Sequence, residues 1–391
     1  MKSVMRASLV GVALLAAMTN AGQAAPAPNH ALPSAFDYQP QSDDERSLWL
    51  EMAEQERVMK TSKFLITDPA LNAYIRQILC RTVGQDRCAS TRIYIMRTPQ
   101  FNAAMAPNGM MMVWSGLLLR ARNEAELATV LGHEFGHFEN QHSLQSFRDI
   151  RSKTNAMAWL SFVPYVGFFG QLGLIGSVFA FNRDMERQAD IVALHYLAES
   201  GYDPMAASAI WEHLRAEMDA TATERNRSSM KDQSGGFWAT HPNSGERMEY
   251  LQAAALQLKS KGKRTGETEY RTNLAAWWPK LIDDQIKLND FGATDFLLQQ
   301  LAGKNWSAEL LYARGELYRA RGKPGDFAQA AIYYKQSIDS AATLPECWRG
   351  LGLALIRDGK KEAGQRALRQ YLVEKPDAAD KAMIALMGGE R

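Results

Sequence analysis

The fold of this chain is decided by residues 123–147, which read NEAELATVLGHEFGHFENQHSLQSF. Asn123, with Glu126 three positions later, forms a capping box, which predicts that a helix begins here. The pattern predicts that this helix runs to about the end of the quoted stretch. His133 and His137 stand four residues apart in it and therefore share one helical face, so both imidazoles can reach one metal ion.

The chemistry of this motif requires two further groups. Glu134 directly follows the first histidine, which places a carboxylate where it can take a proton from a metal-bound water. A catalytic zinc ion has three protein ligands and one open position. We expect the third ligand to be Glu186, in a second helix that begins near Asn182. Asp190 lies four residues further on the same face, where it can accept the free ring N–H of a histidine ligand.

These residues allow other interpretations. His142 and His195 are the alternative ligands, but His142 is five residues from His137 and points off the shared face, so a structural role is favoured for both. The motifs could also be two packed histidines and an exposed charged helix end. Against this, the acids fall on one stripe, and small residues would let the two helices approach closely: Gly132, Gly136 and Ala189.

Strands are few and occur early in the chain. Residues 92–96, RIYIM, alternate as a strand does, and two extended segments flank the turn signal Pro107-Asn108-Gly109. Helical patterns cover about 43–59 and 69–79, and helices dominate the rest of the chain. We therefore predict an α+β fold that is mainly α.

Four blocks together resemble the HtpX and CAAX-prenyl-endopeptidase-like zinc metallopeptidases, which are of the gluzincin type. They are the extended hairpin upstream, HEFGH at 133–137, the E-x-x-A-D of 186–190 and THPNSGER at 240–247. The resemblance covers residues 100–250. It implies one Zn²⁺ per chain, bound by His133, His137 and Glu186, with Glu134 as general base.

The resemblance also assigns roles outside the metal ligands. Substrate is expected to add to an edge strand around 101–106, contacting Asn102, Ala103 and Ala104, and an extended peptide can do so through main-chain hydrogen bonds. His241 and Arg247 are expected near the metal, against the scissile carbonyl or its oxyanion. His241 could instead bind the zinc as a fourth ligand and hold the enzyme inactive, and the sequence leaves both possibilities open.

The start of the chain has the pattern of a secretory signal peptide. Residues 1–24 contain Lys2, Arg6 and an apolar stretch, which predicts cleavage after Ala24; an uncleaved anchor is the alternative. A Pro-rich flexible leader would occupy 25–42. Export exposes the chain to an oxidising compartment, which predicts a disulfide. We expect it to join Cys80 and Cys88 and to leave Cys347 as a buried thiol.

Charge and composition exclude several classes of protein. The chain of 391 residues is 46% hydrophobic and 23% charged, as folded globular proteins are. Its formal charge is +2, and both surplus basic residues lie in the signal segment. A neutral mature chain has no bulk attraction for nucleic acid, so we expect no nucleic-acid partner.

Residues 156–181 carry no charge and are long enough for a membrane span. His137 precedes this segment and Glu186 follows it, and both must bind one ion. A single crossing is therefore impossible. We expect either a buried apolar hairpin or a peripheral contact with a membrane surface.

The C-terminal part contains a helical repeat. Gly315 and Gly352 occupy equivalent positions 37 residues apart, close to the 34-residue period of TPR units. Helices around 270–302 would supply an earlier, degenerate unit. We therefore predict a zinc metallopeptidase domain at 43–265 and a TPR-like helical domain at 266–391.

The signal peptide, the paired cysteines and the TPR-like helical domain favour the periplasmic, TPR-bearing branch of the family. That branch implies an endopeptidase that hydrolyses misfolded or stalled outer-membrane proteins and docks on their assembly machinery through the TPR domain. The alternative is a chaperone-like assembly factor whose protease activity is normally latent.

Overall fold

A computed structural model describes residues 40–89, 91–153, 181–229, 244–258, 262–340 and 344–389. The predicted signal peptide, almost all of the predicted leader and residues 156–180 of the apolar segment lie outside these ranges. The disulfide joins Cys80 to Cys88, and Cys347 is a buried free thiol, as the sequence predicted.

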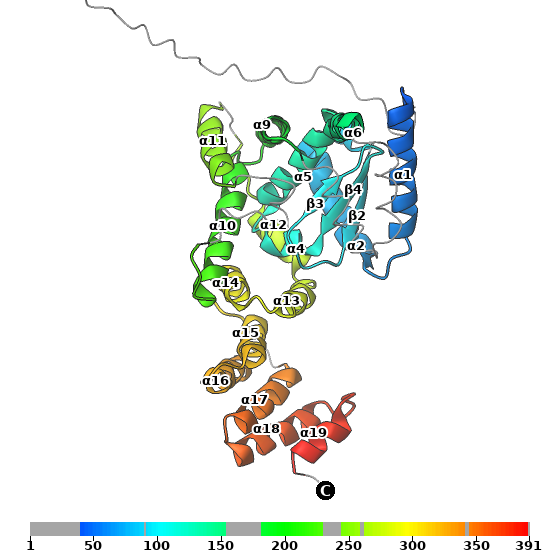
Figure 1. Ribbon diagram of the computed structural model, residues 1–391. Coiled ribbons are helices and arrows are strands. Elements are labelled where there is room, and N and C mark those ends of the chain that lie inside the picture. Colours follow the sequence, from blue (N-terminus) through cyan, green and yellow to red (C-terminus); the bar gives the residue numbers. More distant parts are fainter. Residues whose placement is uncertain are drawn as a thin grey trace, which may run out of the picture. The chain divides into compact units, whose positions relative to one another are not determined.

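The N-terminal half combines helices with four short strands (Figure 1). Its helices are α1 (Asp43–Met59), α2 (Pro69–Val83), α3 (Gln85–Ala89), α4 (Ser115–Arg120), α5 (Glu124–Glu139), α6 (His142–Lys153), α9 (Arg183–Ser200), α10 (Ala206–Glu224) and α11 (Ser244–Gln257). The strands are β1 (Leu65–Ile66), β2 (Arg92–Met96), β3 (Ala103–Met105) and β4 (Met110–Trp114). The mainly helical α+β prediction is confirmed.

The four strands form one mixed sheet in the order β1-β2-β4-β3. β2 pairs with β4 in parallel, whereas the predicted hairpin of β3 and β4 is antiparallel, with Ala104 opposite Met112. Gly109 has a φ of 82°, a left-handed conformation that glycine adopts without strain, so the chain can reverse there. β3 is one of the two edge strands of the sheet.

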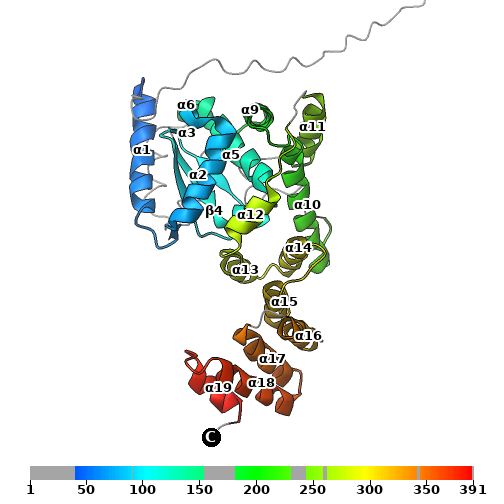
Figure 2. The ribbon, with the colours of Figure 1, turned by 180° about the vertical axis from the view of Figure 1, so that it is seen from behind.

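Alternation along β4 divides the core into two layers. Met110 and Met112 pack with α1 on one face, and Met111 and Val113 pack with α2 and α5 on the other. Seen from behind, α2 lies in front of the sheet (Figure 2). The sheet therefore separates α1 from the helix that carries the histidine motif.

The C-terminal half is entirely helical in the residues described. Its helices are α12 (Glu267–Leu274), α13 (Trp278–Ile286), α14 (Phe291–Ala302), α15 (Ala308–Arg321), α16 (Asp326–Asp339), α17 (Pro345–Arg357), α18 (Lys361–Glu374) and α19 (Lys381–Met387). α15 pairs with α16 and α17 with α18, which is consistent with a TPR-like region. Leu297 and Leu317 belong to the same hydrophobic core as α5.

Turn residues set the ends of these paired helices. Ser307 caps α15 by accepting a hydrogen bond from the backbone N–H of Leu310. Gly322, with a φ of 65°, ends the helix in the left-handed conformation typical of a C-cap. None of the helices described combines the length and the apolarity that crossing a membrane requires.

Candidate metal centre

Side-chain caps fix where the two helices of the site begin. Asn123 Oδ1 accepts a hydrogen bond of 2.9 Å from the Glu126 backbone N–H, as the capping box predicted. Asn182 Oδ1 accepts bonds from the N–H groups of Asp184 and Met185 at the start of α9. These caps set the position along each helix of the residues that follow.

Small residues let α5 and α9 approach closely, as the sequence predicted. A Cβ atom built on Gly136 would lie 3.2 Å from both the Cα and the carbonyl oxygen of Ala189. One on Gly132 would lie 3.5 Å from the Cα of Ala193. This approach brings the third predicted ligand within reach of the histidines.

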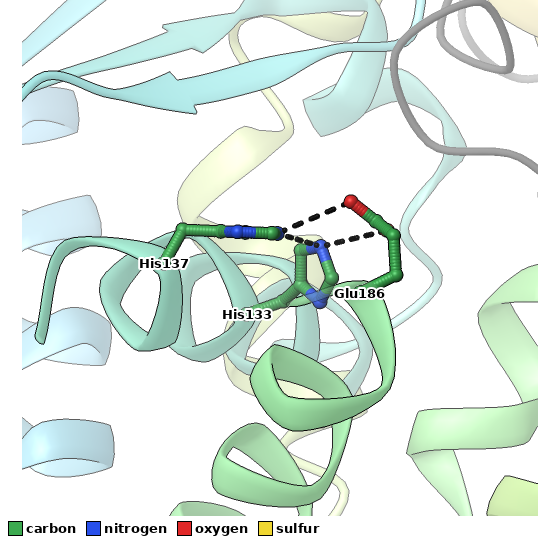
Figure 3. A group of neighbouring side chains, drawn as sticks. All are labelled: His133, His137 and Glu186. Carbon is green, nitrogen blue, oxygen red and sulfur yellow. Dashed lines mark hydrogen bonds and ion pairs between the residues drawn. The ribbon is translucent and has the colours of Figure 1, made fainter. Parts of the chain in front are cut away.

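His133, His137 and Glu186 bring their ligand atoms together, within 4.8 Å of one another. The two Nε2 atoms of the histidines are 3.0 Å apart, and Glu186 Oε1 lies 3.3 Å from His137 Nε2. All three side chains are at most 2% exposed. Figure 3 shows them pointing toward one another from the two helices. In the part of the chain described, no other group of histidine, cysteine or acid side chains has this arrangement.

The donor set fits a zinc ion. Two imidazole nitrogens and one carboxylate oxygen are ligands that zinc takes in catalytic sites, where a fourth position stays open. The lone pairs of these atoms converge in a buried place, which is unfavourable unless a cation binds them. His133, His137 and Glu186 therefore form a zinc-binding triad.

An acid on α9 orients the first histidine. Asp190 Oδ1 lies 2.9 Å from His133 Nδ1, the ring nitrogen that faces away from the other ligands. Tyr250 and Arg247 donate hydrogen bonds to the same carboxylate. Burial alone would raise the pKa of Asp190, but the charges of Arg247 and His133 hold it well below its usual range. The acid therefore stays ionised and fixes the ring of His133.

The second histidine is held differently. His137 Nδ1 lies 2.9 Å from His142 Nδ1, and Phe181 stacks on the His137 ring with 3.9 Å between centroids. The prediction that one helix runs to about Phe147 is wrong, because α5 ends at Glu139. Gln141 then adopts a φ of 54°, so His142 begins a new helix and turns back onto His137.

Arg247 is only 2% exposed and lies against the ligands rather than in an open cleft. Its guanidinium pairs with Asp190 and is 3.2 Å from Glu186 Oε2. It also stacks over Trp211, 4.1 Å from the ring centroid. A direct contact with the scissile carbonyl remains a prediction for this residue.

Several predicted site residues have other positions. His195 is half-buried on α9, nine residues beyond Glu186, and is not in the ligand cluster. His241 lies outside the residues described. Sequence reasoning gave no site role to four residues that contact the ligands or their partners: Gln188, Trp211, Tyr250 and Phe181. In the sequence, the polar pair Asn140-Gln141 could have predicted the turn that brings His142 to His137.

Comparisons with known proteins agree with this geometry. Residues 65–255 match the model of peptidase family M48. The chain is 26% identical over 216 residues to the mitochondrial metalloendopeptidase OMA1 of Schizosaccharomyces pombe, covering 53% of this chain and 58% of that protein. Identity to the OMA1 of Arabidopsis thaliana is 31% over 171 residues, or 42% of this chain and 32% of that protein.

The chain is also similar to a bacterial protease. The chain is 26% identical over 219 residues to the beta-barrel assembly-enhancing protease of Escherichia coli K12, covering 51% of this chain and 45% of that protein. The chain thus spans from about a third to under two thirds of the length of these relatives.

Proposed function

The chain belongs to peptidase family M48, and from that premise we propose that it is a zinc-dependent endopeptidase of the periplasm. Its substrates in this proposal are misfolded or stalled outer-membrane proteins. The observation that carries the catalytic part is the convergence of His133, His137 and Glu186 in a buried cluster, with Glu134 between the two histidines on the same helix.

The residues of the chain divide the chemistry between them. A zinc ion held by the triad would supply Lewis-acid polarisation of a peptide carbonyl and would activate water for attack. Glu134, 2% exposed on α5, acts as the general base and returns the proton to the leaving amine. Asp190 keeps the His133 ring in place throughout.

The substrate would bind to the edge strand β3. The Trp114 N–H donates to the Asn102 carbonyl, and the Ala106 N–H donates to the Met110 carbonyl. Alternation along an antiparallel pair then turns the N–H and C=O groups of Ala103 and Met105 to the outer edge. An extended peptide can pair with these groups whatever its side chains, which suits a protease for unfolded chains.

The cellular role is supported by two observations. The N-terminal 24 residues have the pattern of a secretory signal, and one relative is a beta-barrel assembly-enhancing protease. The helical pairs from α15 to α18 would dock substrate or the outer-membrane assembly machinery. For the segment 156–181, which lies almost entirely outside the residues described, both alternatives stay open: a buried apolar hairpin or a peripheral contact with a membrane surface.

The function is tested with Glu134→Gln in the full mature chain. We expect this variant to bind one zinc ion and unfold like the wild type, but to degrade unfolded casein roughly 10²–10⁴-fold more slowly, because only the proton acceptor is lost. Wild-type turnover by this variant would refute the mechanism.

A chaperone-like assembly factor with a latent protease is the second candidate. The intact zinc triad favours the enzyme, whereas His241, if it binds the metal as a fourth ligand, would favour latency. Under the latency hypothesis His241→Ala raises basal degradation of casein. A fall to the level of Glu134→Gln would instead assign His241 to catalysis.

A further inference from the structure

A chain of two contacts leads away from the second histidine ligand. His137 Nδ1 lies 2.9 Å from His142 Nδ1, and His142 Nε2 lies 3.1 Å from Gln188 Oε1. We propose that His142 and Gln188 are positioning residues, which hold His137 in the one tautomer that can bind the metal ion. The proposal rests on the zinc site of the proposed function, but its tests measure zinc affinity and the ring tautomer.

The direction of the hydrogen bonds follows from the ligand atom. His137 Nε2 faces Glu186 and the other histidine, so it is the nitrogen that must keep a lone pair for the metal. The ring proton of neutral His137 then resides on Nδ1, which donates. His142 Nδ1 must accept this bond, so the proton of His142 is on Nε2. That proton is donated to Oε1, the side-chain amide oxygen of Gln188.

Reversing the direction of these hydrogen bonds would prevent His137 from binding the metal ion. If the Gln188 side chain presented its NH₂ group, His142 would accept at Nε2 and donate from Nδ1. His137 would then have to accept at Nδ1 and carry its proton on Nε2, where it blocks metal binding. The metal-competent tautomer on α5 therefore requires the Gln188 amide to present its oxygen to His142, as it does here.

The surroundings leave the two rings little freedom. His142 is fully buried at the start of α6, and Phe181 stacks on the His137 ring at an interplanar angle of 17°. The partner of His133 is the ionised carboxylate of Asp190. The partner of His137 is the neutral ring of His142, whose own orientation is fixed by Gln188. Partners of this kind raise metal affinity by fixing the ligand before the ion arrives.

The test compares two substitutions of one residue. His142→Phe keeps a ring of similar size but removes the acceptor, and His142→Asn places an amide oxygen near the position of Nδ1. We expect His142→Phe to weaken zinc binding roughly 10–100-fold, measured by competition with a chromophoric chelator, and His142→Asn to restore most of it. His195→Phe, a change of the same kind outside the cluster, should bind zinc like the wild type.

Two results would overturn the proposal. One is wild-type zinc affinity in His142→Phe. The other is equal loss in His142→Phe and His142→Asn, which would mean that His142 acts by filling space.

A second measurement reads the tautomer directly and covers the case in which His142→Phe does not fold. Nitrogen NMR of ¹⁵N-histidine-labelled, metal-free Glu134→Gln protein should show the His137 proton on Nδ1. Adding Gln188→Met, at an exposed position, removes the terminal acceptor, so a second population with the proton on Nε2 should appear. A His137 tautomer that is the same with and without Gln188→Met would refute the proposal.

Discussion

Glycines allow close packing both where α5 crosses α9 and among the paired helices α15 to α18, which form the C-terminal tail. The two regions bury different side chains. At the crossing, Gly136 meets the backbone of Ala189, and the side chains enclosed nearby are histidines and acids. In the tail, Gly315 and Gly350 both face the ring of Tyr334, which is fully buried. Close packing is therefore common to the two regions, and the enclosed side chains make only one of them a metal site.

The two regions also satisfy their buried polar groups differently. The Tyr334 hydroxyl donates a 2.6 Å hydrogen bond to Glu316 and accepts one from Arg319, so this buried polar group has its partners without a ligand. The crossing gathers nitrogen and oxygen lone pairs that one metal ion can bind together. Ligand binding should thus stabilise the crossing and leave the tail unchanged.

The largest effect is expected from removing the ligand on α9. Glu186→Ala deletes one of three ligands, so zinc affinity should fall on the order of 100-fold or more. This exceeds the usual loss of affinity when a residue that only hydrogen-bonds to a ligand is removed. Casein degradation should fall with it. Glu199→Ala, on an exposed position of the same helix, is the control. Full zinc occupancy in Glu186→Ala, measured by metal analysis, would show that another residue is the third ligand.

Replacing one glycine of each region by valine is the most direct test of whether the metal site and the tail are independent. A Cβ on Gly350 would lie 2.4 Å from the Tyr334 ring, so Gly350→Val should destabilise the tail by about 1–3 kcal/mol and leave zinc affinity unchanged. Gly136→Val should push α9 away and weaken zinc binding.

Hydrogen exchange and zinc titration of both variants would separate the two effects. If Gly350→Val weakened zinc binding as much as Gly136→Val, the two regions would not be independent.

The smallest expected effect is on acid stability, and it concerns a buried acid that has protein partners instead of a metal. Glu56 accepts hydrogen bonds from Arg92, Tyr94 and Asn108. Burial opposes ionisation, but the bonds from Arg92 and Tyr94 outweigh it and lower the pKa of Glu56 to about 2. A carboxyl with a lowered pKa stabilises the fold above its unfolded pKa of about 4.5 and loses that contribution as the pH falls toward 2.

We expect this contribution to be at most about 2 kcal/mol, because the partly exposed guanidinium of Arg92 is screened by solvent. Urea unfolding between pH 6 and pH 2 would measure it. Glu56→Gln should be less stable at pH 6 and should lose part of the pH dependence. An unchanged pH dependence in this variant would assign acid lability to other carboxyls.

The sequence determined those features that depend on neighbours a few residues apart. The spacing of His133 and His137, the Asn123 cap and the hairpin at Gly109 follow from local periodicity and turn chemistry, and the structure has each of them. Glu186 was also reachable, because its own helix has a recognisable start and a stripe of acids.

Only the tertiary structure decided what surrounds those ligands. Arg247 lies 57 residues from Asp190 in the sequence, and the recruitment of His142 depends on a left-handed residue at Gln141 that a continuous helical pattern conceals. Helical periodicity repeats every 3.6 residues and carries no information about which distant side chain meets a given face. Long-range packing is set by the whole core. Asp190 was predicted from the sequence as the partner of a histidine ligand, but the pairing of Arg247 with Asp190 and the contact of His142 with His137 became visible only in the folded chain.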